Sequence, residues 1–254
     1  MSKTALVGGE HVDERRSSEK GQLTMPFYIV CDVSWSMTPD IEALNAALED
    51  LAAEIRTEPA VDDVGRISVL TFSDTAGVAV PLGQVSELRM PRLAAQNGTN
   101  YSAAFELLAD TIAADVVRLK QEGFRPYRAC AFFLTDGEPL DSGWAETFKR
   151  KLTYDRTTGV GNRMHPIFVP FGFRDAPEHI MRQLAYPPEK GKWYAARTSN
   201  VDDALKGVLD VIMRTVITSS RNGGAGQRGA LQLAAPATGA ALASGDSEYD
   251  EDFA

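Results

Sequence analysis

The sequence predicts an α/β fold, in which a doubly wound, mostly parallel sheet with one antiparallel edge strand carries helices on both faces. The first observation is a set of short, wholly apolar runs such as Phe27-Tyr28-Ile29-Val30-Cys31, which are typical of strands buried on both faces. The second is that segments with apolar residues at helical spacing, such as residues 41–55, lie between these runs. Strands that alternate with helices indicate a parallel sheet that is covered on both sides.

The individual elements are predicted in chain order. Strands are expected at residues 27–31, 67–72, 78–82, 128–134, 166–171 and 192–195. The third of these is assigned to the sheet edge, where Pro81 is tolerated although it cannot donate a backbone hydrogen bond. Helices are expected at residues 38–55, 100–121, 144–152, 178–184 and 201–217. Thr38 and Pro39 favour the start of the first helix, and Gly123 favours the end of the second.

The two ends of the chain differ in composition from its middle. Residues 1–24 are polar, mixed in charge and without periodicity, and we interpret them as a flexible arm. Residues 219–254 are rich in Gly and Ala and then acidic, which is typical of a disordered linker with an acidic tip. The folded domain is therefore expected to span residues 25–218.

The overall composition excludes some classes of partner. The 254 residues include 26 basic and 35 acidic side chains, so the net charge of −9 disfavours a nucleic-acid binder. No apolar run approaches the ~20 residues that span a bilayer, and no signal-peptide core is present, so we expect a cytoplasmic protein without a membrane partner. Cys31 and Cys130 suit a reducing compartment and are expected to be buried thiols, too far apart to form a disulfide.

Oxygen-bearing side chains gather in three loops that are expected at one edge of the sheet. Asp32-Val33-Ser34-Trp35-Ser36 follows the first buried strand, and Asp136 follows the strand at 128–134. Thr99 precedes the helix at 100–121. Ligands of doubly wound sheets bind where the strands end. Because carboxylates and hydroxyls are hard ligands, this set predicts a site for Mg²⁺ or Mn²⁺.

The motif Asp32-x-Ser34-x-Ser36, together with Thr99 and Asp136, resembles the metal-ion-dependent adhesion site of von Willebrand factor A (VWA) domains. The resemblance covers about residues 25–217. It implies that the two serines bind Mg²⁺ directly and that Thr99 does so directly or through water. It further implies that the aspartates act through water or by anchoring the serines, and that a partner protein supplies an Asp or Glu as the last ligand.

The segment Met25-Pro26-Phe27-Tyr28-Ile29-Val30-Cys31-Asp32 is also similar to the bacterial intracellular VWA branch associated with tellurium resistance. This resemblance implies a stress-response or signalling complex whose partners include a kinase or a phosphatase. One departure is Asn97-Gly98-Thr99, where Gly-Gly-Thr is usual, and it leaves the threonine in place. Another is Trp35, at a position that is often Gly.

These features predict a protein-interaction module that is not an enzyme, since no histidine lies in the three loops to act as a base. Trp35, Tyr101 and Glu138 are candidate residues of the rim that contacts the partner. One alternative is a VWA subunit of a chelatase-type AAA+ ATPase complex, with the ATPase on another chain because this chain has no phosphate-binding loop. A second alternative is a metal-dependent phosphohydrolase with Asp32 as nucleophile, which Ser34 disfavours because that chemistry requires an Asp-x-Asp motif.

The acidic tip raises a further possibility for the same site. Its carboxylates could take the last coordination position of the metal in place of a partner, and the candidates are Asp250, Glu251 and Asp252. The site would then be blocked until the tip is displaced.

Overall fold

The fold is a mixed sheet with helices on both faces, as the sequence predicts. The computed structural model describes residues 21–198, 200–226, 231–237 and 241–249. The strands of the sheet lie in the order β3-β2-β1-β5-β6-β7-β8, and the short β4 pairs with the start of β1. Their bounds are β1 Leu23–Asp32, β2 Gly65–Phe72, β3 Ala76–Gly83, β4 Arg125–Pro126, β5 Cys130–Thr135, β6 Ile167–Gly172, β7 Lys192–Ala196 and β8 Leu242–Asp246.

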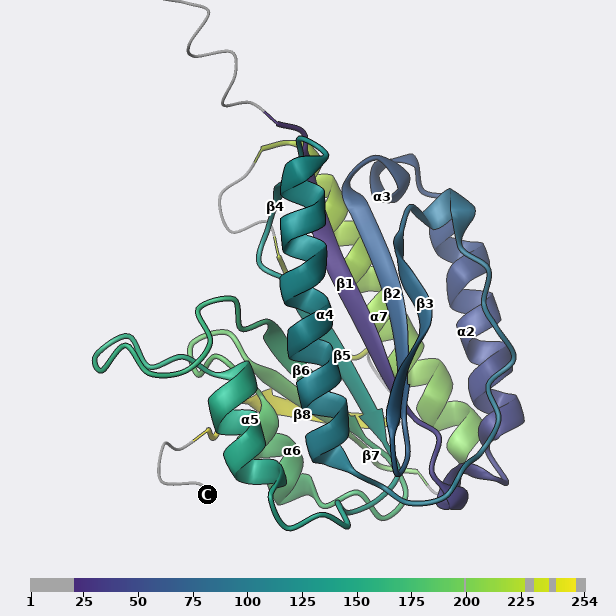
Figure 1. Cartoon of the computed structure of the whole chain (residues 1–254). Helices are drawn as coiled ribbons and strands as arrows, with labels where there is room; N and C mark the ends of the chain where they lie inside the picture. The colour runs from purple at the N-terminus through teal and green to yellow at the C-terminus, as the bar shows by residue number, and fades with distance from the viewer. Residues whose placement is uncertain (1–20, 199, 227–230, 238–240, 250–254) are drawn as a thin grey trace, which may run out of the picture.

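Two layers of helices enclose the sheet, with α4 and α5 in front of it and α7 behind it in Figure 1. The helices are α2 Ile41–Arg56, α3 Pro59–Val64, α4 Tyr101–Gln121, α5 Trp144–Leu152, α6 Glu178–Leu184 and α7 Val201–Gly224, with short 3-10 turns η1 Trp35–Met37 and η2 Val85–Glu87. One apolar core lies between the sheet and α2, α3 and α7, and the other lies between the sheet and α4, α5 and α6.

The central strand β1 supplies both cores because successive side chains point to opposite faces. Phe27, Ile29 and Cys31 belong to the core under α2 and α7. Tyr28 and Val30 belong to the core under α4. Since β1 pairs in parallel with β2 and with β5, the carboxyl ends of these three strands meet at one edge of the sheet.

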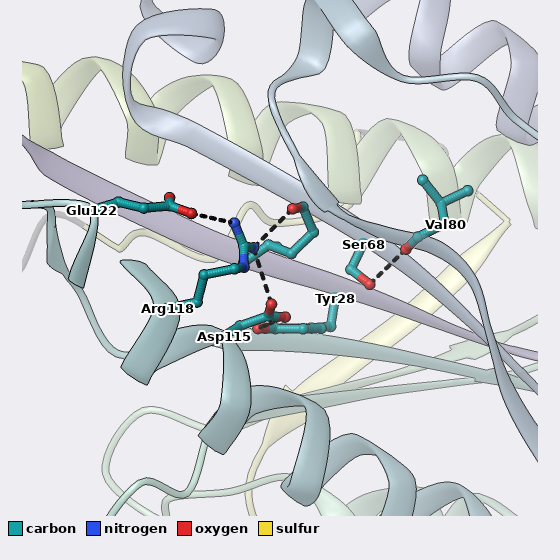
Figure 2. A network of polar contacts seen from close by, with 7 residues as sticks. Tyr28, Ser68, Val80, Asp115, Arg118 and Glu122 are labelled. Atoms are coloured by element: carbon teal, nitrogen blue, oxygen red, sulfur yellow. Dashed lines mark hydrogen bonds and ion pairs between the residues drawn. The ribbon is translucent and has the colours of Figure 1, made fainter. Parts of the chain in front are cut away.

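A polar network crosses the second core and fixes α4 on the sheet (Figure 2). The Tyr28 hydroxyl donates to Asp115 Oδ2 at 3.0 Å, and Arg118 Nη2 donates to Asp115 Oδ1 at 3.0 Å and to the carbonyl of Leu82 at 3.0 Å. The network thus joins α4 to both β1 and β3, and it satisfies the hydroxyl of a tyrosine that is fully buried.

The expectation of one antiparallel edge strand is wrong, because the described sheet has one at each edge. β3 pairs antiparallel with β2, and β8 pairs antiparallel with β7. β8 lies within residues 219–254, which were expected to be a disordered tail. A strand at a sheet edge is held by backbone hydrogen bonds, so it needs no apolar pattern of its own.

Two elements are longer than predicted. β1 begins at Leu23 rather than at Phe27, and α7 continues to Gly224 rather than ending near residue 217. Ser219 and Ser220 are buried in α7, so the helix packs through small residues that do not produce an apolar repeat. The predicted arm at 1–20 and the tail residues 227–230, 238–240 and 250–254 lie outside the described residues.

The first helix begins three residues later than predicted. Thr38 does not cap it, since the Thr38 hydroxyl donates to the carbonyl of Trp35 at 2.7 Å and closes η1. Asp40 is the residue before the helix, and its carboxylate is paired with Arg174 instead of the helix amides. The motif after β1 is therefore part of a short 3-10 turn.

The cysteines are free and buried, as expected. In the register of β1 and β5, Cys130 pairs with Phe27 and Cys31 with Leu134, an offset of four residues or roughly 13 Å. Within the described part of the chain, no helix is both long enough and apolar enough to cross a membrane.

Candidate metal centre

The side chains predicted to hold a metal lie at the edge where β1 and β5 end. Asp32 is the last residue of β1, and Asp136 follows the last residue of β5. Asp32, Ser34 and Asp136 are 1%, 1% and 2% exposed. Cys31 and Leu134 are in register, so Asp32 is level with Thr135 and Asp136 comes one residue later, and the two carboxylates follow adjacent strands at one edge of the sheet.

Asp32 organises the loop that follows β1. Its Oδ1 accepts a hydrogen bond from the Ser34 amide at 2.8 Å, and its Oδ2 accepts one from the Thr135 hydroxyl at 2.7 Å. Both bonds are buried, and each closes a different loop onto the same carboxylate. The geometry is that of an anchor which orients Ser34.

The two serine hydroxyls are side by side and reach Asp136. Ser34 Oγ lies 2.9 Å from Ser36 Oγ, and Ser36 Oγ donates to Asp136 Oδ1 at 2.8 Å. The second oxygen of this carboxylate, Asp136 Oδ2, is buried and has no hydrogen-bond partner among the described residues. A buried carboxylate oxygen without a partner is costly, so this atom is suited to a cation or a water bound to one.

Burial affects the charge of both carboxyl groups. Desolvation raises the pKa of Asp32 to about 6, although the bonds from Ser34 and Thr135 oppose the rise. Desolvation also raises the pKa of Asp136, against the bonds that it accepts and the charge of Arg174. Two carboxylates brought this close under poor solvation favour a divalent cation, which supplies the charge that water supplies elsewhere.

Thr99 is brought to this edge by a tightly bonded loop. Its carbonyl accepts from the Leu140 amide at 2.9 Å, which ties it to the loop after β5. The Asn100 amide donates to the carbonyl of Ser73 at 2.8 Å, which ties it to the end of β2. Gly98 has a φ of 75°, where glycine is favoured, and an added Cβ would collide with the Asp74 carboxylate. Thr99 itself is 8% exposed.

The residues predicted for the rim behave differently from one another. Trp35 is 69% exposed and Glu138 is also exposed, so both are accessible to a partner. The prediction for Tyr101 is wrong, because its side chain is fully buried. Its hydroxyl lies 3.0 Å from Thr135 Oγ1, the group that bonds Asp32, and 2.9 Å from the Gly137 carbonyl. Tyr101 therefore helps to hold the loops that carry both carboxylates.

Sequence reasoning missed three residues at this edge. Thr135 carries the bond that anchors Asp32. Leu140, in the loop after β5, is 76% exposed and adds a second large apolar side chain near the site. Arg174 follows β6, pairs with Asp40 through two hydrogen bonds, and interacts electrostatically with Asp136. The rule that ligands bind after strand ends points to the loop after β6 and could have identified Arg174.

The described residues contain no group of three or more His, Cys, Asp and Glu side chains arranged to hold a metal ion. A metal at this edge would therefore depend on hydroxyls as much as on carboxylates, which is the chemistry of a hard cation and not of a thiol- or imidazole-bound one.

Comparison with known proteins agrees with this architecture. Residues 27–138 match the family model of the von Willebrand factor type A domain, a stretch that contains Asp32, Ser34, Ser36, Thr99 and Asp136. No curated protein sequence gives a significant match.

Solved structures show the same fold at low sequence identity. The chain is similar to the pilus adhesin SpaC from Lactobacillus rhamnosus GG in its open conformation, with a TM-score of 0.55 and 14% identity. It is also similar to a von Willebrand factor type A protein from Catenulispora acidiphila, with a TM-score of 0.53 and 15% identity. A third similar structure is proximal thread matrix protein 1 from the mussel byssus, with a TM-score of 0.52 and 13% identity. Each match covers 78% of this chain but only 30%, 43% and 48% of the other chains, so these proteins are more than twice as long as the part they share.

Proposed function

For a chain whose residues 27–138 match the VWA domain family, we propose a non-enzymatic interaction module that binds Mg²⁺ or Mn²⁺ and, through it, a carboxylate of a partner protein. The observation that carries the proposal is Asp136 Oδ2, a buried oxygen without a partner beside two adjacent serine hydroxyls. VWA domains commonly serve as protein-interaction modules. In this chain the candidate site lies at the edge of the sheet where β1 and β5 end.

The residues present fit a hard cation. Ser34, Ser36 and Thr99 would supply neutral hydroxyl oxygens, and Asp32 and Asp136 would supply the charge. Asp32 already uses both of its oxygens to hold Ser34 and Thr135, so its part is to orient a ligand and neutralise the cation. A bound cation with two carboxylates near it retains attraction for one further carboxylate, which a partner's Asp or Glu would provide.

Exposed apolar side chains beside the site would supply contact area for a partner. Trp35 and Leu140 are the two most exposed large apolar residues of this edge, at 69% and 76%. Aromatic residues often contribute much of the binding energy of an interface, and the residues around them exclude water from it. Arg174, which is part-exposed at 38%, would add a cationic contact for an acidic partner.

Calorimetry with Mg²⁺ and Mn²⁺ tests the metal site. Protein stripped with a chelator is expected to bind one equivalent, and Ser34→Ala and Asp136→Asn are expected to bind none. Thr38→Val is the matched control, because it removes a neighbouring hydroxyl that faces the Trp35 carbonyl and not the site. Equal binding by wild type, Ser34→Ala and Asp136→Asn would refute the site.

In chelator, Asp136→Asn is expected to unfold no more easily than wild type, since it removes a poorly solvated carboxylate.

Capture of a partner from lysate tests the interaction. Bound protein is expected in Mg²⁺ and not in chelator, and a double Trp35→Ala/Leu140→Ser variant is expected to lose capture while keeping its affinity for Mg²⁺. A partner captured equally well in excess chelator would contradict the proposal.

The phosphohydrolase alternative is not favoured by the site. Asp32 would have to attack phosphorus, yet it is 1% exposed and both of its oxygens accept buried hydrogen bonds. A nucleophile needs a free oxygen in reach of substrate. The subunit of an AAA+ complex remains compatible with a carboxylate-binding metal site, and the identity of the captured partner distinguishes it from other complexes.

The resemblance of residues 25–32 to tellurium-resistance proteins supports the finer proposal of a bacterial stress-response or signalling complex in the cytoplasm. A kinase, a phosphatase or an AAA+ ATPase in the Mg²⁺-dependent fraction of the capture would support it.

A further inference from the structure

A second binding feature lies at the edge of the sheet formed by β7. Residues 241–249, here called the edge segment, run along this edge as β8 and continue past it, and β8 is the yellow strand next to β7 in Figure 1. The pairing extends from Lys192 opposite Asp246 to Ala196 opposite Leu242. Beyond it, the Ser247 amide donates to the Gly191 carbonyl at 3.0 Å. The contact is thus a continuous antiparallel ladder.

The edge segment has little tendency to form a strand by itself. Ala243, Gly245 and Asp246 are residue types that are depleted in strands, and Ser244 and Asp246 are exposed. Its extended conformation is therefore imposed by the acceptor strand β7, as it is for a peptide bound by strand addition.

Apolar side chains fix the register of the edge segment at both ends. Leu242 is 8% exposed and packs against Gly207 of α7, where an added Cβ would lie 3.2 Å from the leucine side chain. Tyr249 packs edge-to-face on Tyr186, with ring centroids 5.1 Å apart. These contacts resemble anchor residues seated at the two ends of a peptide groove.

Opposite charges also match across the contact. Asp246 pairs with Lys192 of β7 at 2.7 Å, and Glu248 pairs with Arg182 of the neighbouring helix α6. Two basic side chains, one from the edge strand and one from α6, thus face the two acidic side chains of the edge segment.

Trp193 shows that the bound segment is not ideally accommodated. Its indole Nε1 is buried and has no hydrogen-bond partner among the described residues. Gly245 lies directly on it, since an added Cβ at position 245 would be 2.7 Å from this nitrogen. A buried donor without an acceptor destabilises the bound arrangement, and release of the segment would return the donor to water.

We propose that the β7 edge is an acceptor site for extended acidic peptide segments of a partner protein, and that the edge segment occupies it as a replaceable ligand. The ligand class is an extended chain with an aliphatic anchor, a glycine over Trp193 and acidic residues facing Lys192 and Arg182. This site differs from the candidate metal centre, because the acidic end of the segment lies at the amino end of β7, whereas Asp136 follows the carboxyl end of β5.

The test uses two valine substitutions in the full chain. Gly245→Val places a side chain against Trp193 and is expected to release the segment, so amides 242–246 should exchange with solvent at least tenfold faster. Ser244→Val adds the same side chain at an exposed neighbouring position and should not accelerate exchange. A labelled synthetic peptide of residues 241–249 is expected to bind Gly245→Val at least tenfold more tightly than wild type, whose edge is occupied. The peptide with Asp246→Asn and Glu248→Gln should bind at least threefold more weakly.

Two results would overturn the proposal. One is failure of the peptide to bind Gly245→Val although exchange shows that its edge is free. The other is equal affinity for wild type and variant, which would place the peptide elsewhere. If Gly245→Val does not fold, wild-type exchange decides: amides 242–246 should open at least a hundredfold more often than amides 28–31 of β1, and equal rates would show that the segment is a permanent strand.

Discussion

The pKa of His165 is determined mainly by burial. The ring is 4% exposed, its Nδ1 lies 3.1 Å from the Pro166 carbonyl, and it packs edge-to-face on Tyr186. Burial lowers its pKa from 6.5 to about 4; the charges of Arg128 and Arg156 act in the same direction, and that of Glu189 opposes them. The folded protein therefore holds a neutral histidine at neutral pH.

The stability of the protein is predicted to depend on pH through this residue. Because the folded pKa lies below the unfolded one, the unfolded chain binds more protons between pH 6.5 and about 4. The contribution of His165 is complete above pH 6.5 and is lost as the pH falls, by about 2 kcal/mol from pH 7 to pH 5. Urea unfolding of wild type and His165→Asn at both pH values measures it. Comparing the pH dependence of the two proteins isolates the contribution of His165 from that of Asp32 and Asp136, whose raised pKa values make stability rise as the pH falls. If the free energy of unfolding depends on pH equally in wild type and variant, the prediction is wrong.

The residues of the candidate site were predictable to different degrees for physical reasons. Asp32 and Asp136 were identifiable because each follows a strongly apolar strand, and the ends of parallel strands share one edge. Tyr101 was misplaced, because its position at the first turn of α4 does not reveal which way its ring points. Asp136 Oδ2 could not be predicted as an unpaired atom, since hydrogen-bond satisfaction depends on distances across loops.

The buried tyrosine in the network of Figure 2 differs from a second buried tyrosine in the charge of its hydrogen-bond acceptor. The Tyr28 hydroxyl donates to a carboxylate, whereas the Tyr194 hydroxyl donates to the neutral carbonyl of Ala234 at 2.6 Å. Burial raises the pKa of both tyrosines, so both remain donors at neutral pH. Hydrogen bonds to charged groups contribute more than bonds to neutral ones.

Tyr28→Phe is therefore expected to lower the free energy of unfolding by about 2 kcal/mol and Tyr194→Phe by about 1 kcal/mol. Both substitutions keep the ring and so preserve the apolar packing. Urea titrations of the two variants under the same conditions measure the difference. A larger loss for Tyr194→Phe would mean that the Asp115–Arg118 pair satisfies itself without Tyr28.

Helix bounds were predicted correctly where the apolar residues recur at clear helical spacing. α5 and α6 have the predicted bounds, because a short amphipathic helix between strands has few alternatives. The end of α7 was predicted to be linker. In the structure Gly223 packs closely against Met25, since a Cβ added at Gly223 would lie 2.9 Å from the Met25 sulfur. Small residues signal flexibility in composition but permit close packing in a folded chain, and only tertiary contacts separate the two.

The candidate metal centre and the proposed acceptor site at β7 lie on different strands of one sheet. Asp136 follows the carboxyl end of β5, and Gly245 pairs with Trp193 near the amino end of β7. The acidic tip, with Asp250, Glu251 and Asp252, lies outside the described residues. The edge segment that precedes it ends with Tyr249 near Thr153, where α5 ends.

The two sites are accordingly predicted to be energetically independent. A cation that binds only the folded protein stabilises it by about 1.4 kcal/mol at ten times its dissociation constant. This gain is measured as a higher urea midpoint of unfolding in Mg²⁺ than in chelator. It should be lost in Ser34→Ala and kept in Gly245→Val, because the effects of changes at separated sites without shared partners usually add. Conversely, Ser34→Ala should leave the amide exchange of residues 242–246 unchanged. If Gly245→Val abolishes the effect of Mg²⁺, the sheet couples the two sites, and binding of an acidic segment at β7 would change the affinity of the candidate site for Mg²⁺.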